Sequence, residues 1–242
     1  MKYAVIADIH ANLAALEAVL TDVEKDSAIA EIWCLGDIVG YGPDPHRCIE
    51  IIEKRCSACI AGNHDWAAID KIDSSSFNPD AAVAIEWTSR QLKTGDIHFL
   101  ESLPMTLEKK SFTLAHGSPH DPIWEYILSP QDAEKSLGFF KTPNCFIGHS
   151  HSPAWFECTR SCSRRGFLQD TSIKLGKRRH LINPGSVGQP RDGIPDAAYA
   201  IYDSDAETVT LRRIPYDIAE TQQRMQDAGL PEWLIGRLAE GR

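Results

Sequence analysis

The sequence predicts an α/β protein built as a two-layer β-sandwich flanked by helices. Three observations favour this fold class. Short apolar runs alternate with helical periodicity up to residue 61, strand patterns dominate from 154 to 211, and the tail 217–242 is helical again. The chain has 242 residues without an internal repeat, low-complexity tract or long linker, so we expect one domain spanning 1–242.

The N-terminal part alternates strand and helix patterns. The apolar runs typical of buried strands are 3–7, 32–35 and 59–61. An apolar stripe at helical spacing lies between the first two runs and consists of Leu13, Leu16, Leu20 and Val23. Pro45 is suited to begin a second helix before the third run. This β-α-β-α-β order predicts a parallel sheet with right-handed crossovers.

The remaining elements follow from the same patterns. Helices are expected over 79–93, around 98–100, over 130–139 and along the tail 217–242. Strands are expected at 105–107, 112–115, 145–147, 167–168, 173–175, 181–182, 198–202 and 208–211. We also expect a β-rich hairpin elaboration at 158–180, which carries a cluster of basic residues. Such a cluster either faces an extended polyphosphate or is a solvated hairpin.

Charge and hydropathy narrow the function classes. The net charge of −9 argues against broad nonspecific binding to polymeric nucleic acid or acidic membranes. No apolar stretch approaches the length of a membrane span, and the start reaches Asp8 too soon for a secretory signal. We therefore expect a cytoplasmic protein.

The seven cysteines are an odd, scattered set, which predicts reduced thiols and no disulfide framework. Cys56 and Cys59 have C-x-x-C spacing, and Cys158 with Cys162 forms a looser second pair. A structural zinc site from these four is the alternative to ordinary core and surface residues.

Five polar clusters each follow an apolar run. In chain order they are Asp8-Ile9-His10, Gly36-Asp37-Ile38-Val39-Gly40, Gly62-Asn63-His64-Asp65, His116-Gly117 and Gly148-His149-Ser150-His151. Because open α/β sheets hold ligands at the carboxyl ends of their strands, we expect these clusters to meet at one edge of a sheet. Together they offer the nitrogen and oxygen donors of a two-metal site.

Two of the clusters contain donors separated by a single residue. In an extended chain, residues i and i+2 project to the same side, so Asp8 and His10 can reach one ion. His149 and His151 repeat this spacing with two imidazoles. Either pair alone is weak support for a metal site, because such spacings occur often by chance.

The other candidate donors come singly. Asp37 lies in a glycine-flanked turn and either bridges two cations or is a solvated turn residue. Asn63 supplies an amide oxygen, or caps a turn instead. His116 directly follows a strand and is a plausible last nitrogen donor.

The ordered set resembles the calcineurin-like metallophosphoesterase family, whose pattern is D-x-H, G-D-x-x-G, G-N-H-D/E, a lone His and G-H-x-H. The resemblance extends through Arg191 when the loop 183–191 is counted. It implies an α/β/β/α architecture and two metal ions. The first ion would be held by Asp8, His10, Asp37 and His151. The second would be held by Asp37, Asn63, His116 and His149.

The resemblance also implies that His64 is the catalytic imidazole, which protonates the leaving oxygen or stabilises charge on the phosphoryl group. The alternative is a hydrogen bond that only supports a metal ligand. Asp65 either orients His64 or caps the next helix.

Three residues are candidates for substrate binding. Asn12 either contacts phosphate or caps the helix that begins at Leu13. Arg191 either grips a substrate phosphate or is a surface loop residue. Tyr41 either stacks on a base or shields the site.

These patterns predict dinuclear-metal-dependent hydrolysis of phosphoesters by a metal-activated hydroxide. The expected substrate is a small nucleotide-like phosphodiester or phosphomonoester. Manganese is the favoured metal, and iron, zinc, cobalt and nickel also suit mixed nitrogen and oxygen ligands. One alternative is a catalytically silent metal-binding or protein-interaction module on the same scaffold. Another is a redox or zinc protein built on the cysteines. The sequence does not predict the oligomeric state.

Overall fold

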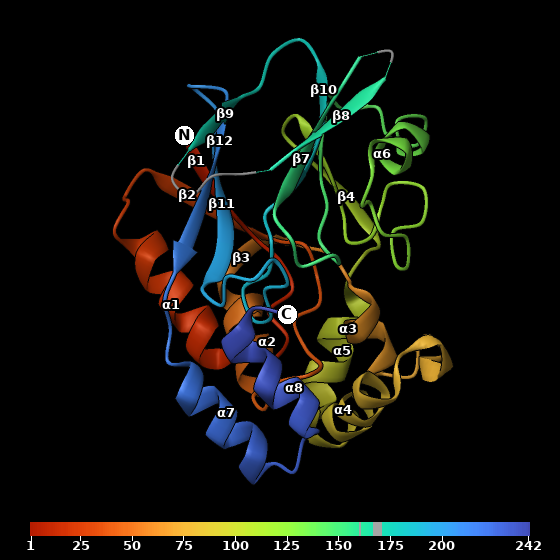
Figure 1. Cartoon of the computed structure of the whole chain (residues 1–242), viewed down its shortest axis with the longest axis vertical. Coiled ribbons are helices and arrows are strands. Elements are labelled where there is room, and N and C mark those ends of the chain that lie inside the picture. Colours follow the sequence, from red (N-terminus) through yellow and green to blue (C-terminus); the bar gives the residue numbers. More distant parts are fainter. Residues whose placement is uncertain (160, 167–170) are drawn as a thin grey trace.

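Two six-stranded sheets form the centre of the molecule (Figure 1). The computed structural model describes residues 1–159, 161–166 and 171–242. The first sheet has the order β3 (Cys56–Cys59), β2 (Ile29–Cys34), β1 (Lys2–Ile6), β11 (Ala197–Asp203), β12 (Thr208–Ile214) and β9 (Ser172–Lys174). The second has the order β4 (Thr106–Lys109), β5 (Phe112–Ala115), β6 (Asn144–Phe146), β10 (Arg179–Asn183), β7 (Ala154–Cys158) and β8 (Cys162–Arg165). The predicted fold class is confirmed.

Each sheet contains neighbouring parallel strands, so the loops that follow these strands lie at one edge of that sheet. β1 pairs in parallel with β2, and β2 with β3, as the alternation of patterns predicts. The crossovers are α1 (Leu13–Glu24) and α2 (Pro45–Arg55). In the second sheet β6 pairs in parallel with both β5 and β10. The carboxyl ends of parallel neighbours therefore lie at the same edge within each sheet.

The two sheets are held together by an aromatic core. The ring centroids of Tyr3 and Trp33 lie 4.8 Å apart, and those of Phe112 and Phe146 lie 4.3 Å apart. Tyr202 packs on both pairs. Since each such ring removes roughly 150–250 Å² from water, this layer fixes the separation of the sheets and the relative position of their strand ends.

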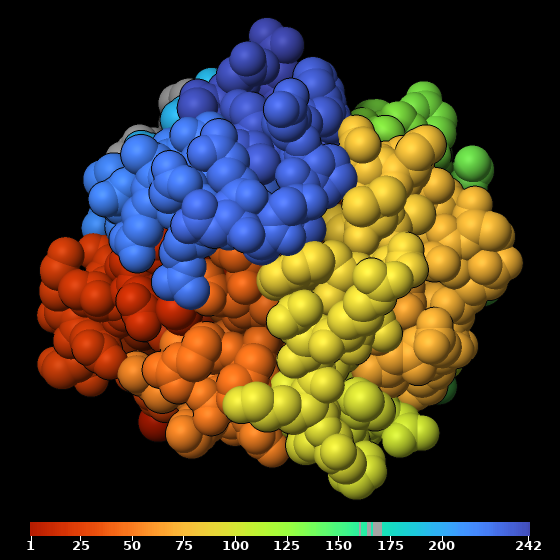
Figure 2. All heavy atoms as spheres, turned by 90° about the horizontal axis from the view of Figure 1, so that it is seen from below, coloured from red at the N-terminus to blue at the C-terminus, as the bar shows by residue number. Residues whose placement is uncertain are grey.

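Helices cover the outer faces. α1 and α2 pack on the first sheet through Leu16, Val19, Ile49 and Ile52, and α6 (Pro130–Ser136) packs on the second. The remaining helical elements are α3 (Asn63–Ala67), η1 (Ser74–Ser76), α4 (Pro79–Gln91), α5 (Thr94–Ser102), α7 (Ile218–Asp227), α8 (Glu232–Gly236) and η2 (Arg237–Glu240). Figure 2 shows the C-terminal helices, in blue, lying beside the yellow segment of α4 and α5. No helix in the described ranges is long and apolar enough to cross a bilayer.

Some boundaries differ from expectation. The strand predicted at 59–61 ends at Cys59, and the helix predicted over 130–139 ends at Ser136. The strand predicted at 167–168 lies outside the described residues. The segment 158–180 does not form one hairpin: β8 pairs with β7 in the second sheet, whereas β9 pairs with β12 in the first.

One cysteine prediction is wrong. Cys158 and Cys162 form a disulfide, because the β7–β8 pairing sets them directly opposite each other with Cα atoms 4.1 Å apart. A spacing of four residues does not reveal this register. The other five cysteines are free, so the two C-terminal thiols are not available to a four-cysteine zinc site with Cys56 and Cys59.

Candidate metal centre

The polar clusters come together where strand ends of both sheets meet. β1, β2 and β3 of the first sheet lead to Asp8, His10, Asp37 and Asn63. β5 and β6 of the second sheet lead to His116, His149 and His151. The expectation of a single sheet edge is therefore wrong, since the sandwich places two edges against each other. The aromatic core between the sheets holds these two edges in place relative to each other.

The paired donors converge through strained loops and not through extended chain. Asp8 and His10 have φ angles of 52° and 49°, and His149 and His151 have 65° and 56°. Asp37, at 53°, is also left-handed. The argument from i and i+2 in a strand is wrong here, because β1 has already ended at Ile6. Such conformations are costly for residues with a Cβ and are typical of functional sites.

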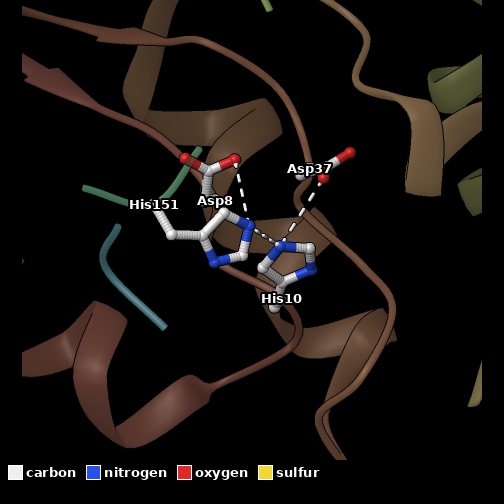
Figure 3. A group of neighbouring side chains, drawn as sticks. All are labelled: Asp8, His10, Asp37 and His151. Carbon is white, nitrogen blue, oxygen red and sulfur yellow. Dashed lines mark hydrogen bonds and ion pairs between the residues drawn. The ribbon is translucent and has the colours of Figure 1, made fainter. Parts of the chain in front are cut away.

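The side chains form two groups that share one carboxylate. In the first group, ligand atoms of Asp8, His10, Asp37 and His151 all lie within 4.8 Å of one another (Figure 3). Asp37, His116 and His149 form the second group by the same measure. The Oδ1 atom of Asn63 lies 3.1 Å from Nε2 of His116. Every one of these side chains is buried.

Three of the imidazoles are oriented by backbone carbonyls. The Nδ1 atoms of His10, His116 and His151 lie 3.1, 2.9 and 2.7 Å from the carbonyl oxygens of Val39, Leu35 and Gln189, respectively. A carbonyl only accepts, so each Nδ1 carries a proton and donates it. In the neutral tautomer Nε2 is then a bare lone pair facing the centre. Histidines that bind metals are usually oriented in this way.

The Nε2 lone pairs of His10 and His151 face each other without a proton between them. The Nε2 atoms of His10 and His151 are 3.0 Å apart, although neither has a hydrogen to share in that tautomer. Asp8 Oδ2 and His149 Nε2 are buried and have no hydrogen-bond partner among the described residues. Asp37 Oδ2 lies 3.3 Å from Nε2 of His116. Buried acceptors without donors are unfavourable unless a cation binds them. The donor set fits divalent ions that accept both imidazole and carboxylate ligands.

The pKa values of the candidate ligands agree with a site that binds cations. Burial holds the pKa values of His10 and His151 well below the ordinary value, so both imidazoles are neutral at neutral pH. Burial raises the pKa of Asp8 to about 7. His116 is buried too, but Asp37 beside it raises its pKa to about 9. A cation bound at Asp37 must therefore displace a proton from His116, which makes binding depend on pH.

Asp65 holds the loop that carries Asp37. Its carboxylate accepts hydrogen bonds from the backbone N–H groups of Asp37, Ile38, Val39 and Gly62 at 2.8–3.1 Å. It makes no hydrogen bond with the ring of His64 in the described part of the chain. Asp65 thus joins the end of β2 to the start of α3, which is the capping alternative of the two left open.

His64 lies on α3 directly beside the first group. Its ring centroid is 4.7 Å from that of His10, 4.4 Å from Tyr41 and 4.8 Å from Phe77. Its backbone N–H donates to Oδ1 of Asp37 at 2.9 Å. Burial lowers the pKa of His64 to about 4, and Nδ1 has no partner among the described residues. Gly40, with a φ of 87°, packs on this ring so closely that any Cβ would overlap Nδ1.

Comparison with known proteins identifies the family. Residues 1–207 match the family model of the calcineurin-like phosphoesterase superfamily domain. The chain belongs to this superfamily. The fold expected from the sequence is therefore that of a calcineurin-like phosphoesterase, a metal-dependent hydrolase family.

Three relatives of this calcineurin-like phosphoesterase are informative. A metallophosphoesterase from Sphaerobacter thermophilus, known from a crystal structure, is 43% identical to this chain in sequence. The two structures have a TM-score of 0.91, and the match covers 100% of this chain and 99% of that one. An uncharacterised protein of Methanocaldococcus jannaschii is 40% identical over 99% of this chain and 98% of its own length. The symmetrical bis(5'-nucleosyl)-tetraphosphatase of Photorhabdus laumondii is 33% identical over only 38% of either protein.

The side chains of Asn12 and Tyr41 contact other residues of this chain. Asn12 Oδ1 accepts from the backbone N–H of Ala15 at 3.2 Å, and Nδ2 donates to the carbonyl of Gly188 at 2.9 Å. The structure thus supports capping of α1 over phosphate contact. The buried ring of Tyr41 lies against His10 and His64, which supports shielding over base stacking.

Arg191 is half-buried next to the first donor group. Its guanidinium donates to Oε1 of Gln189 at 2.7 and 3.1 Å and to the hydroxyl of Tyr41 at 3.3 Å. Its backbone N–H donates to the carbonyl of His151 at 3.1 Å. The basic segment is different: Arg178 pairs with Glu157, and Arg179 donates to three backbone carbonyls in the connection between α6 and β6.

Sequence reasoning missed Tyr126. Its ring stacks on the imidazole of His149, with centroids 3.8 Å apart and planes 22° apart, although 45% of the residue is exposed. Phe77 and Trp124 form a second aromatic contact nearby, at 5.2 Å, and Phe77 also touches His64. No local pattern marks these residues, because they lie in loops and reach the centre only through the tertiary fold.

Proposed function

We propose that this calcineurin-like phosphoesterase hydrolyses small nucleotide-like phosphoesters with two divalent cations bound at the clustered donors. Manganese is the proposed metal. The observation that carries the proposal is the pair of donor groups sharing Asp37, together with the buried Nε2 lone pairs of His10 and His151, which face each other without a proton between them. Cations bound at these donors would satisfy the buried lone pairs.

The residues divide between the two cations as the donor groups do. Asp8, His10, Asp37 and His151 would hold one ion, and Asp37, Asn63, His116 and His149 the other. A bound pair of divalent ions offsets phosphoryl charge and lowers the pKa of water towards neutrality. The backbone carbonyls behind the histidines and the four N–H bonds to Asp65 hold the donors before substrate arrives.

His64 is the proposed catalytic imidazole. With its pKa lowered to about 4 it is neutral at pH 7, so one ring nitrogen carries a proton and can donate a hydrogen bond. In this role it stabilises the charge that develops on the phosphoryl or leaving oxygen. The bond between its backbone N–H and Asp37 fixes the ring relative to both donor groups.

Two observations support a nucleotide-like substrate. Arg191 presents a guanidinium beside the donors, and guanidinium groups bind phosphate oxygens in pairs. The exposed face of Tyr126 beside His149 offers a surface on which a base can stack. The tetraphosphatase of Photorhabdus laumondii carries a nucleotide activity in its name, and the overlap with it is limited to 38% of each protein.

We further propose that this protein acts in the cytoplasm and that it needs neither a membrane nor polymeric nucleic acid as a partner. The net charge of −9 supports the absence of these two partners, because a surplus of carboxylates repels both acidic membranes and nucleic acid.

A substrate panel tests the proposal. The purified protein is loaded with manganese and assayed on p-nitrophenyl phosphate, bis(p-nitrophenyl) phosphate, cyclic nucleotides and dinucleoside polyphosphates. We expect turnover of at least one nucleotide-like ester, abolished by chelation and restored by manganese. The double variant Cys56→Ser, Cys59→Ser is the matched control, and its metal content and activity should equal those of the wild type.

Absence of turnover on every ester, with both ions bound, would contradict the proposed function. It would instead support the alternative of a silent binding module on the same scaffold.

A further inference from the structure

The chain between β10 and β11 crosses from the second sheet to the first beside the metal centre. Its residues 183–190, which we call the crossing loop, are all buried. Loops usually run over the surface, because backbone polar groups that leave water must find partners in the protein. The hydrogen bonds of the crossing loop therefore indicate which parts of the molecule it holds in place.

On the side of the first sheet, the crossing loop holds the backbone of Asp8. The carbonyl of Asp8 accepts hydrogen bonds from the hydroxyl of Ser186 at 2.7 Å and from the N–H of Gly188 at 2.9 Å. The N–H of Val187 donates to the carbonyl of Ala7 at 2.9 Å. The left-handed φ of 52° at Asp8 is unfavourable for a residue with a Cβ and persists only where its neighbours hold it. The crossing loop supplies these bonds.

The same hydroxyl also leads to His151. The Oγ atom of Ser186 accepts a hydrogen bond from the N–H of Gln189 at 2.8 Å. The carbonyl of Gln189 in turn accepts the Nδ1 proton of His151 at 2.7 Å. One hydroxyl thus joins the backbone of Asp8 to the residue that orients His151. Asp8 and His151 are both members of the first donor group.

The other end of the crossing loop is fixed to the second sheet. The Nδ2 atom of Asn183 donates to the carbonyl of Gly148 at 2.6 Å and to the hydroxyl of Ser150 at 3.0 Å. This loop after β6 carries one histidine of each donor group, so Asn183 does not distinguish between the groups. The hydrogen bonds of Ser186, in contrast, lead to two ligands of the first group.

We propose that Ser186 is a positioning residue for the first metal ion. Its hydroxyl keeps Asp8 and, through Gln189, His151 in the places that they have in the first donor group. Loss of this hydroxyl should weaken the binding of the first ion and leave the second ion in place. The inference rests on the proposed function, because it takes the two donor groups as cation sites.

Calorimetric titration of the metal-free protein with manganese tests the role without relying on turnover. We expect two binding steps in the wild type. In Ser186→Ala, one step should be weakened by roughly 10–100-fold, the usual effect of removing a group that holds a metal ligand, while the other step stays close to the wild-type value. Two unchanged steps, or equal weakening of both, overturn the proposal.

Anomalous diffraction identifies which ion is affected. Crystals of Ser186→Ala are soaked in manganese at a concentration between the two dissociation constants of the variant. We expect one peak, beside His116 and His149, whereas the wild type at the same concentration should show both peaks. A peak that remains beside His10 and His151 while the other is lost contradicts the assignment of Ser186 to the first ion.

Ser136→Ala is the matched control. Ser136 is also fully buried, and its hydroxyl donates to the backbone carbonyl of Asp132 within α6 at 3.2 Å. Thermal melting of the metal-free proteins compares their stability. The control should also lose stability but keep both manganese affinities. Equal loss of the first ion in the control would mean that a general loss of stability, and not positioning, explains the effect.

Ser186→Cys is the second variant, for the case in which Ser186→Ala does not fold. It keeps nearly the same shape and replaces the hydroxyl by a weaker donor and acceptor. It should fold and should lose affinity for the first ion, though less than Ser186→Ala. A folded Ser186→Cys variant with wild-type affinity for both ions overturns the proposal.

The wild-type assay on bis(p-nitrophenyl) phosphate separates this inference from the proposed function. Turnover of that ester, with no effect of Ser186→Ala on manganese binding, refutes the positioning role alone. Selective loss of the first ion in Ser186→Ala, in a protein that hydrolyses no ester, supports the positioning role and refutes the hydrolase. A wild-type protein that binds no manganese refutes both.

Discussion

The Nε2 atoms of His10 and His151 lie 3.0 Å apart, while the Nδ1 atom of each ring donates to a backbone carbonyl. Two neutral acceptors at this separation repel each other unless a cation lies within reach of both. Asp8 and Asp37 complete the group around them (Figure 3). The proposed metal chemistry follows from this contact and from the equivalent group at His116 and His149.

Asp37→Asn is expected to weaken the binding of both ions together, because Asp37 belongs to both donor groups. Removing a residue that only hydrogen-bonds to a metal ligand lowers the affinity for the metal by roughly 10–100-fold. The loss of a carboxylate shared by both ions should lower it at least as much. Metal content by mass spectrometry measures this. Asp205→Asn, which alters an exposed carboxylate, should retain both ions. Two tightly bound ions in Asp37→Asn would exclude the shared role.

His64→Ala should keep both ions and slow turnover by roughly 10²–10⁴, the usual worth of a positioned catalytic group. The ring lies edge-on against His10, a proposed ligand, and is not itself a member of either donor group. Steady-state kinetics with parallel metal analysis separates the two effects. A wild-type rate in this variant would remove His64 from the mechanism.

Gly40→Ala tests the position of the same ring without removing it. The added Cβ overlaps Nδ1 of His64, and the left-handed backbone of Gly40 adds strain. We expect kcat to fall, by roughly 10²-fold if the ring moves about 1 Å. Gly95→Ala is the control, since nothing lies near its Cβ position. Equal rates for both variants would mean that the exact place of His64 does not matter.

Asp65→Ala should both destabilise the fold and lower metal content. It leaves four buried N–H groups without an acceptor, which should cost at least about 3 kcal/mol of the free energy of unfolding. Asp132→Ala removes a cap at the exposed start of α6 and should cost only about 1 kcal/mol with no loss of metal. Urea denaturation compares them. Similar costs for the two variants would argue against the bridging role of Asp65.

The sequence predicted the candidate donors but not the way in which they converge. Strand ends, helical stripes and the five clusters are local patterns, so the α/β/β/α order and the candidate ligands could be predicted. The left-handed turns at Asp8 and His10, and the meeting of two sheet edges, depend on contacts across the sandwich. The Cys158–Cys162 disulfide and Tyr126 depend on pairing and loop paths in the same way. Neither hydrophobic periodicity nor residue spacing in the sequence indicates these features.

Glu31 predicts a specific dependence of stability on pH. Hydrogen bonds from Ser57, Trp33 and Lys109 lower its pKa from 4.5 to about 2, and Lys109 links β2 of the first sheet to β4 of the second. A depressed folded-state pKa stabilises the protein above pH 4.5, and this contribution is lost as the pH falls towards 2.

Glu31→Gln should therefore lower the free energy of unfolding by about 1–2 kcal/mol at pH 7, after allowance for solvent screening. The difference from the wild type should shrink steadily below pH 4.5. Denaturation at several pH values measures it, with the exposed Glu108→Gln as the control. A difference that is constant from pH 7 to pH 3 would contradict the assignment.

Anomalous diffraction from a manganese-soaked crystal tests the central claim most directly. We predict two peaks roughly 3.5–4 Å apart, one beside His10 and His151 and the other beside His116 and His149, with Asp37 in contact with both. A single peak, or no peak at these side chains in the presence of saturating manganese, would contradict the account.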